Sequence, residues 1–208
     1  MTNQPLILAS QSPYRAKLLE STGLPFIQQT SHIDEDHIKS SRMHQPPSTM
    51  AIELAKAKAN AVSKTYPLAM VIAADQLCVS KNNTILSKPG NKENAINQLK
   101  TLSGCEHRLI NGLVIYQNQT CLWTFSDECQ MHMRPLSEND IVAYIERDTP
   151  YDCCGSYKIE SHGRSLFSHI QASSDAIQGL PLSPLLQAIR DLNILSNQKD
   201  EYTNLTKG

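Results

Sequence analysis

The chain has 208 residues, of which 40% are hydrophobic and 19% are charged, and its 19 basic and 20 acidic side chains leave a net charge of -1. A chain of this length can bury an ample core, but its balanced charge lacks the basic surface that duplex nucleic acid or an anionic membrane attracts. No apolar run approaches the roughly 20 residues of a bilayer span, and the opening residues lack a signal-peptide pattern. These features predict a cytoplasmic protein whose partner is a small molecule, with no nucleic acid and no membrane.

Six cysteines are scattered without a C-x-x-C pair, and the seven histidines lack a metal-binding spacing. We therefore expect reduced, mostly buried thiols and ordinary polar histidines. A nucleophilic cysteine would need a histidine or a cationic neighbour, which the sequence does not identify.

The first segment is an apolar strand over 6–9 that runs through a polar turn into a helix over 13–21. Ser12 is a good N-cap and Pro13 suits the first helical position. Arg15 lies in the first turn, where free backbone N–H groups favour an anion. The segment indicates either a phosphate site or a well-capped connection with a solvated arginine.

A second strand is expected over 26–33, followed by a polar loop over 32–47. The acidic run Asp34-Glu35-Asp36 in this loop is typical of solvated surface.

The next predicted helix, over 48–66, has a lysine on its apolar face. Lys58 shares one helical stripe with small and aliphatic residues, namely Ala51, Leu54, Ala55 and Val62. An unpaired buried charge is costly, so this lysine must either extend past the packing or point its ammonium into a polar cleft at a partner.

An apolar strand over 70–74 is expected to end at Asp75-Gln76. Catalytic groups collect at the carboxyl ends of strands in α/β sheets, so Asp75 is the leading catalytic candidate, with a turn-forming aspartate as the alternative. The turn Lys81-Asn82-Asn83 then predicts a hairpin into a strand over 84–86, which is followed by Lys88-Pro89.

The rest of the chain continues to alternate between helix and strand patterns. We expect a helix over 92–102, strands over 109–116 and 120–133, a helix opened by a capping box at 137–140, and a last helix lined by Leu185, Leu186, Ile189 and Leu192. This alternation favours an α/β class. Since no repeat or linker is found, we predict one domain over 1–195 and a polar, disordered tail over 196–208.

Six short motifs follow one another along the chain: Ser12-Pro13-Tyr14-Arg15-Ala16-Lys17-Leu18-Leu19, Leu54-Ala55-Lys56-Ala57-Lys58-Ala59, Ala74-Asp75-Gln76, Lys88-Pro89, Gly155-Ser156-Tyr157 and Gly179-Leu180-Pro181-Leu182. None is specific alone, but their order and intervals resemble the Maf family of nucleoside triphosphate pyrophosphatases. The resemblance implies a mixed, elongated sheet flanked by helices, with two lobes and a central cleft, similar to inosine triphosphatases. It also implies metal-dependent cleavage between the α and β phosphates, which gives a monophosphate and diphosphate.

The resemblance implies roles for residues of these motifs. Asp75 matches the family's proton acceptor, and Asp34-Glu35 matches an acidic pair, so Glu35 and Asp75 are expected to bind Mg²⁺ or Mn²⁺. Phosphoryl transfer requires cations that neutralise the polyphosphate. The residues expected to bind this part of the substrate are Ser12, Arg15, Lys58 and Lys88.

Three further positions bear on the base. Members that look like dTTP and UTP pyrophosphatases have Arg, Thr and Gln where this chain has Tyr14, Gln76 and Glu160, and this combination is similar to the subfamily that hydrolyses 7-methyl-GTP. N7-methylguanine is positively charged, so it gains from stacking on Tyr14 and from a nearby carboxylate. Glu160 could also accept hydrogen bonds from the guanine N1–H and amine.

The favoured hypothesis is therefore a cytoplasmic enzyme that removes 7-methyl-GTP from the nucleotide pool. Two alternatives stay open. One is the same reaction on dTTP, UTP or CTP, and the other is a nucleotide-binding regulator of septum formation with little turnover. The oligomeric state, including a homodimer, also stays open.

Overall fold

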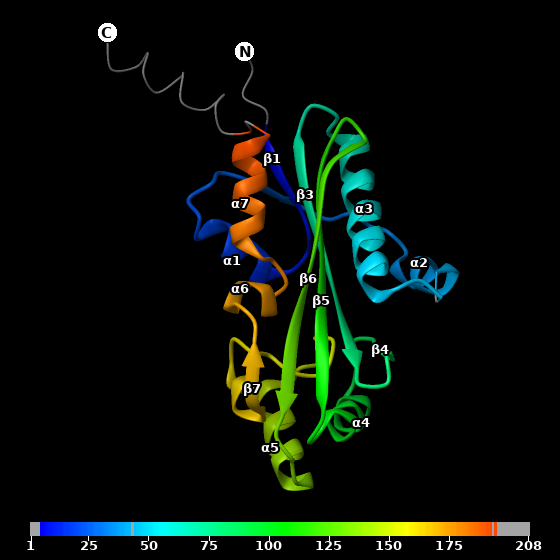
Figure 1. The fold of residues 1–208 in the computed structure, drawn as a ribbon, viewed down its shortest axis with the longest axis vertical. Helices are drawn as coiled ribbons and strands as arrows, with labels where there is room; N and C mark the ends of the chain where they lie inside the picture. Colours follow the sequence, from blue (N-terminus) through cyan, green and yellow to red (C-terminus); the bar gives the residue numbers. More distant parts are fainter. Residues whose placement is uncertain (1–4, 43, 193, 195–208) are drawn as a thin grey trace.

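The structure, a computed structural model, describes residues 5–42, 44–192 and 194. Within this part of the chain a seven-stranded mixed sheet runs along the length of the molecule in the order β2-β1-β3-β5-β6-β7, with β4 paired to β3 (Figure 1). The strands are β1 (Leu6–Ala9), β2 (Ile27–Gln29), β3 (Met70–Ser80), β4 (Ile85–Leu86), β5 (Glu106–Gln117), β6 (Thr120–Met133) and β7 (Phe167–Gln171). Strand β1 pairs in parallel with β2 and β3, and the other pairs are antiparallel. The predicted α/β class with a mixed, elongated sheet is confirmed.

Helices cover both faces of the sheet (Figure 1). One face carries α1 (Pro13–Glu20), α6 (Ser174–Ile177) and α7 (Leu182–Asp191), and the other carries α2 (Glu35–Ser41) and α3 (Pro47–Thr65). Around the other end of the sheet lie α4 (Lys92–Leu102), α5 (Glu138–Asp148) and a 3-10 helix, η1 (His162–Leu166). No helix in the described residues is long and apolar enough to span a bilayer.

The alternation of side chains along β3 divides the core between these two helical layers. Ile72 and Ala74 pack with α1 and α7, whereas Val71 and Ala73 pack with α3. The same alternation directs Asp75 toward α3 and Gln76 toward α6.

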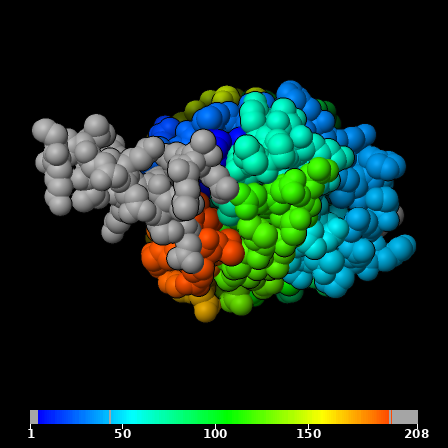
Figure 2. Space-filling view, turned by 90° about the horizontal axis from the view of Figure 1, so that it is seen from above, coloured from blue at the N-terminus to red at the C-terminus, as the bar shows by residue number. Residues whose placement is uncertain are grey.

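Close packing of α3 on the sheet depends on a glycine. Gly112 in β5 pairs with Asp75 in β3, and a Cβ at Gly112 would lie 2.3 Å from the carbonyl carbon of Ala51 in α3. At the other end of the helix, the Gln119 backbone N–H donates a hydrogen bond of 2.8 Å to Ser63 Oγ. Figure 2 shows α3 (cyan) and the β5–β6 hairpin (green) side by side at this end. The helix therefore lies directly over β5, next to the strand that carries Asp75.

The structure corrects several expected boundaries. The strand expected over 26–33 is limited to Ile27–Gln29, and the loop expected over 32–47 contains α2. Asp34 is the N-cap of α2, because its carboxylate accepts a hydrogen bond of 2.9 Å from the His37 N–H. Asp34 and Asp36 are exposed, as expected, but the acidic run lies at the N-terminus of a helix, where negative charge interacts favourably with the helix dipole.

The strand expected over 70–74 does not end at Asp75 but continues to Ser80. The cause is non-local, since β3 forms an unbroken antiparallel ladder with β5 from Val71 to Ser80. Asp75 nevertheless lies beyond the last β1–β3 pair, Leu8 with Ile72, and so past the end of the parallel part of the sheet. The tail predicted over 196–208 lies outside the described residues, and the domain boundary stays a prediction.

Candidate active site

Lys58, on the buried face of α3, is the centre of a group of charged side chains. Its Nζ lies 2.9 Å from Glu35 Oε1 and 2.5 Å from Asp75 Oδ1. The side chains of Lys58 and Asp75 are only 10% and 7% exposed, whereas Glu35 is 40% exposed. The lysine on the apolar stripe thus has the charged partners that its burial requires.

Three consecutive elements of the chain position these groups. Glu35 is the first residue of α2, Lys58 lies in α3, and Asp75 lies in the middle of β3. A fourth residue, Lys39, was not predicted, and its Nζ lies 3.6 Å from Glu35 Oε2. The i, i+4 spacing of Glu35 and Lys39 would have indicated the pair if α2 had been recognised as a helix.

Three lysine side chains lie close enough to Glu35 to affect the pKa of its carboxyl group. Partial burial acts to raise the pKa of Glu35, but the charge and hydrogen bond of Lys58, together with the charges of Lys39 and Lys88, outweigh it. The pKa of Glu35 is therefore below its ordinary value, and the carboxylate is ionised at neutral pH. Lys88, an exposed residue after β4, lies close enough to contribute to this shift.

Arg15 reaches the same region from α1. Its Nε donates a hydrogen bond of 2.9 Å to the Gly179 carbonyl, and its Nη1 donates one of 2.9 Å to the carbonyl of Ala74, next to Asp75. Gly179 has a φ of +89°, and a Cβ there would lie 3.1 Å from Arg15 Nε, so a glycine is needed beside the guanidinium. Ser12 begins this helix, as predicted, since its Oγ accepts from the Arg15 N–H at 3.3 Å.

Cys154 is another residue of this region that the sequence did not indicate. Burial raises the pKa of its thiol, the charge of Asp75 raises it further, and the charges of Lys39, Lys88 and Arg15 oppose these effects. Cys154 therefore lies among the charged residues described above, as an uncharged thiol. No local pattern separates it from the other five cysteines, all of which are free.

Tyr14 and Glu160 form a second group. Burial, followed by a hydrogen bond with Glu160 and the charge of Glu160, raises the pKa of Tyr14 to about 12. Tyr14 is half-buried in the first turn of α1, and Glu160 is exposed in the segment before η1. The structure thus brings together an aromatic ring and a carboxylate that are far apart in the sequence.

Gln76 is held by neighbouring protein groups. Its Nε2 lies 3.0 Å from Asn111 Oδ1, 3.1 Å from the Ala176 carbonyl and 3.0 Å from the Ile177 carbonyl. Asn111 Nδ2 also donates to the Ala176 carbonyl, at 2.9 Å. These contacts tie α6 to β3 and β5 on the face of the sheet away from Asp75. A role for Gln76 at the base stays a prediction.

The two carboxylates suit a divalent metal ion. Glu35 and Asp75 both reach one atom, Lys58 Nζ, so they lie close enough to share a cation. The described residues contain no group of three or more His, Cys, Asp or Glu side chains arranged to hold a metal. Mg²⁺ is commonly held by one or two carboxylates, with substrate phosphates and water as the other ligands. The pair therefore fits an ion that binds together with a polyphosphate.

Comparisons with known proteins identify the family to which the chain is similar. Residues 5–192 match the family described as Maf-like protein. A nucleoside triphosphate pyrophosphatase of Legionella pneumophila (strain Paris) is 40% identical over 195 residues, which cover 94% of this chain and 97% of the relative. The 7-methyl-GTP pyrophosphatases of Rhizobium etli and Vibrio vulnificus are 36% and 35% identical, and each alignment covers 91% of this chain and 97% and 95% of the relatives.

Proposed function

The chain belongs to the Maf-like protein family and is a nucleoside triphosphate pyrophosphatase, and on this premise we propose that its preferred substrate is 7-methyl-GTP. The proposed reaction is hydrolysis between the α and β phosphates, which gives 7-methyl-GMP and diphosphate. We further propose that the reaction takes place in the cytoplasm and removes the methylated nucleotide from the nucleotide pool.

The proximity of Tyr14 and Glu160 is the observation that supports this substrate most directly. The ring of 7-methylguanine carries a positive charge, which is attracted to an aromatic face and to a carboxylate. Glu160 can also accept hydrogen bonds from the N1–H and the exocyclic amine of guanine. A neutral pyrimidine base has no such charge and would gain less from this pair.

We propose that Glu35 and Asp75 hold Mg²⁺ or Mn²⁺ together with oxygens of the triphosphate. The bound ion would neutralise charge on the phosphates and stabilise the leaving diphosphate. Asp75 would accept the proton of the attacking water. The positive charges of Arg15, Lys58 and Lys88 would neutralise the triphosphate as it is cleaved, and the first turn of α1 after Ser12 would supply N–H donors.

The substrate proposal is tested by measuring diphosphate release from 7-methyl-GTP, GTP, UTP, CTP and dTTP in the presence of Mg²⁺ or Mn²⁺. We expect a kcat/KM for 7-methyl-GTP about tenfold or more above the pyrimidine nucleotides, as one cation–π contact and one carboxylate contact would give. A preference for UTP, CTP or dTTP would overturn the base assignment and leave the pyrophosphatase activity in place. Nucleotide binding without release of diphosphate would favour the regulatory alternative.

Two variants separate recognition of the base from cleavage. Glu160→Gln should lower the preference for 7-methyl-GTP and leave the hydrolysis of other nucleotides in place, so a loss of activity on every substrate would contradict its assignment to the base. Asp75→Asn should abolish turnover, because an amide cannot accept the proton, and should retain nucleotide binding as measured by calorimetry. Substantial turnover by Asp75→Asn would reject its catalytic role.

A further inference from the structure

Glu160 lies in a tightly closed turn. The Lys158 carbonyl accepts hydrogen bonds from the N–H groups of Ser161, at 3.2 Å, and Gly163, at 2.9 Å. A Cβ at Gly163 would lie 2.4 Å from this carbonyl oxygen, so the turn closes in this form only around a glycine. The position of Glu160 therefore depends on what holds residues 158–163, here called the Glu160 turn.

Asp148, the last residue of α5, binds this turn directly after Glu160. Its carboxylate accepts from Ser161 Oγ at 3.1 Å, from the His162 N–H at 3.0 Å, and contacts His162 Nδ1 at 2.7 Å. The side chain of Asp148 is 1% exposed, whereas Ser161 and His162 are exposed. A buried carboxylate accepts several strong hydrogen bonds from this one turn and so fixes its position. A neutral side chain could not accept as many hydrogen bonds.

The same helix end also holds the beginning of the turn. Lys158 Nζ donates to the backbone carbonyl of Asp148 at 2.8 Å, and the Lys158 N–H donates to the hydroxyl of Tyr144 at 2.8 Å. Burial acts to raise the pKa of Asp148, but hydrogen bonds from His162 and Ser161 and the charge of His162 outweigh it and lower the pKa. Asp148 is therefore an ionised acceptor at neutral pH.

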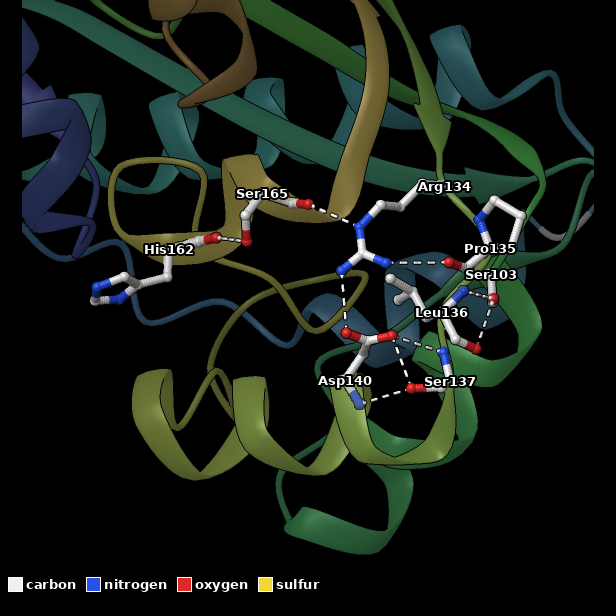
Figure 3. Close-up of polar contacts among 8 residues, drawn as sticks. All are labelled: Ser103, Arg134, Pro135, Leu136, Ser137, Asp140, His162 and Ser165. Atoms are coloured by element: carbon white, nitrogen blue, oxygen red, sulfur yellow. Dashed lines mark hydrogen bonds and ion pairs between the residues drawn. The ribbon is translucent and has the colours of Figure 1, made fainter.

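The start of α5 holds the far end of the turn through a chain of polar contacts (Figure 3). Ser165 Oγ donates to the His162 carbonyl at 2.7 Å, and the Ser165 carbonyl accepts from Arg134 Nε at 3.1 Å. Arg134 Nη2 in turn donates to Asp140 Oδ1 at 3.2 Å, in the first turn of α5. Both ends of α5 therefore contribute to the placement of the Glu160 turn, and Asp148 makes the direct contact.

We propose that Asp148 is a positioning residue for base recognition, which holds the Glu160 turn so that the Glu160 carboxylate stays beside Tyr14. Asp148 acts on Glu160 through Ser161 and His162. The inference rests on the proposed function in one respect, since it takes Glu160 as the residue that recognises the base.

The first test is Asp148→Asn, which preserves shape but removes the charge. We expect KM for 7-methyl-GTP to rise about tenfold, as loss of hydrogen bonds to a charged group would give, with a smaller change in kcat. The preference over UTP should fall in parallel. Glu146→Gln is the matched control, because this exposed carboxylate lies on the same helix and pairs only with Lys92 among the described residues. An unchanged KM and preference in Asp148→Asn would overturn the proposal.

A second variant tests the contact from the side of the turn. Ser161 and His162 are exposed, so the double substitution Ser161→Ala/His162→Ala should fold even if Asp148→Asn does not. It should raise KM for 7-methyl-GTP, but by less than Asp148→Asn does, because the backbone N–H of residue 162 still donates to Asp148. If the residues act through one contact, combining all three substitutions should cause little further loss, whereas fully additive losses would reject the coupling.

Amide hydrogen exchange supplies a measurement that does not depend on the substrate. Exchange in residues 158–163 should be faster in Asp148→Asn, or in the double variant, than in the Glu146→Gln control. If the unaltered enzyme shows no preference for 7-methyl-GTP, the proposed function fails, while faster exchange would still show that Asp148 holds the turn. Exchange that matches the control would overturn the inference whatever the substrate.

Discussion

His107 is a histidine in the core, 1% exposed, whose Nε2 lies 2.9 Å from the Tyr157 hydroxyl. Its Nδ1 has no hydrogen-bond partner among the described residues. Burial, together with the charge of His132, lowers the pKa of His107 to about 4. The ring is therefore neutral at pH 7, and protonating it favours the unfolded chain.

This shift predicts a pH dependence of stability. The unfolded chain, with an ordinary histidine pKa near 6.5, binds more protons than the folded chain between about pH 6.5 and pH 4. The contribution of His107 to the free energy of unfolding should be constant above about pH 6.5. It should decrease as the pH falls below this value, by about 3 kcal/mol in total. Urea unfolding of the unaltered protein and of His107→Gln, at pH 7 and pH 4.5, checks this. Equal losses of stability in both proteins would contradict it.

At the scale of helices and strands, the sequence predicts those elements that depend on interactions between residues close together in the chain. The stripe containing Lys58 predicted α3, and the capping box at Ser137 predicted the start of α5, as the structure confirms. Helix α2 was missed because it has seven residues and buries none of them, so its sequence has no apolar periodicity. The strand predicted over 70–74 is too short, because the continuation of β3 through Asp75 depends on pairing with β5, which no local pattern indicates.

The candidate site likewise has features that the local sequence predicts and features that depend on tertiary packing. Lys58 could be singled out because a charge on an apolar stripe needs a partner, but the identity of its partners depends on how α2, α3 and β3 pack together. Lys39, Asp148 and Cys154 were missed for the same reason. Each becomes notable only through neighbours that lie in other elements or in an unrecognised helix, beyond the reach of a local pattern.

The contact of α3 with the sheet leads to a prediction at this scale. Gly112→Ala would place a Cβ 2.3 Å from Ala51 in α3, so the helix backbone must move. We expect a loss of about 1–3 kcal/mol in the free energy of unfolding, as overpacking usually causes. Activity should fall as well, since α3 carries Lys58 and Gly112 pairs with Asp75. Urea unfolding and diphosphate release measure the two effects.

Gly23→Asn is a suitable control for this substitution. Gly23 has a φ of +74°, which asparagine tolerates better than other side chains, and no atom lies within 4 Å of a Cβ built there. It should therefore change stability and activity little. A Gly112→Ala protein as stable and active as this control would show that α3 does not need the close approach.

For the whole molecule, we expect the chain to fold without a metal ion at the site carboxylates. Glu35 and Asp75 already have a positive partner within the protein, the Lys58 ammonium. The core that supports them is apolar and extends along the full length of the sheet, from β1 to the strands beside α5.

EDTA should accordingly abolish the proposed metal-dependent release of diphosphate without lowering Tm. A ligand that binds only the folded state stabilises it by RT ln(1 + [L]/Kd), so Mg²⁺ with a tightly bound non-hydrolysable nucleotide should raise Tm more than Mg²⁺ alone. Thermal unfolding with and without EDTA, beside an activity assay on the same samples, checks both points. A clear fall in Tm on adding EDTA would show that a metal ion is part of the resting fold.

The bridge made by Lys58 also bears on the order in which ligands bind. An ion that takes both carboxylates from Lys58 leaves that ammonium in need of a new anion. A free metal ion brings no such anion, but a preformed metal–nucleotide complex brings several phosphate oxygens. The complex would then be the true substrate, and kinetics with metal and nucleotide varied independently should follow its concentration rather than that of either component.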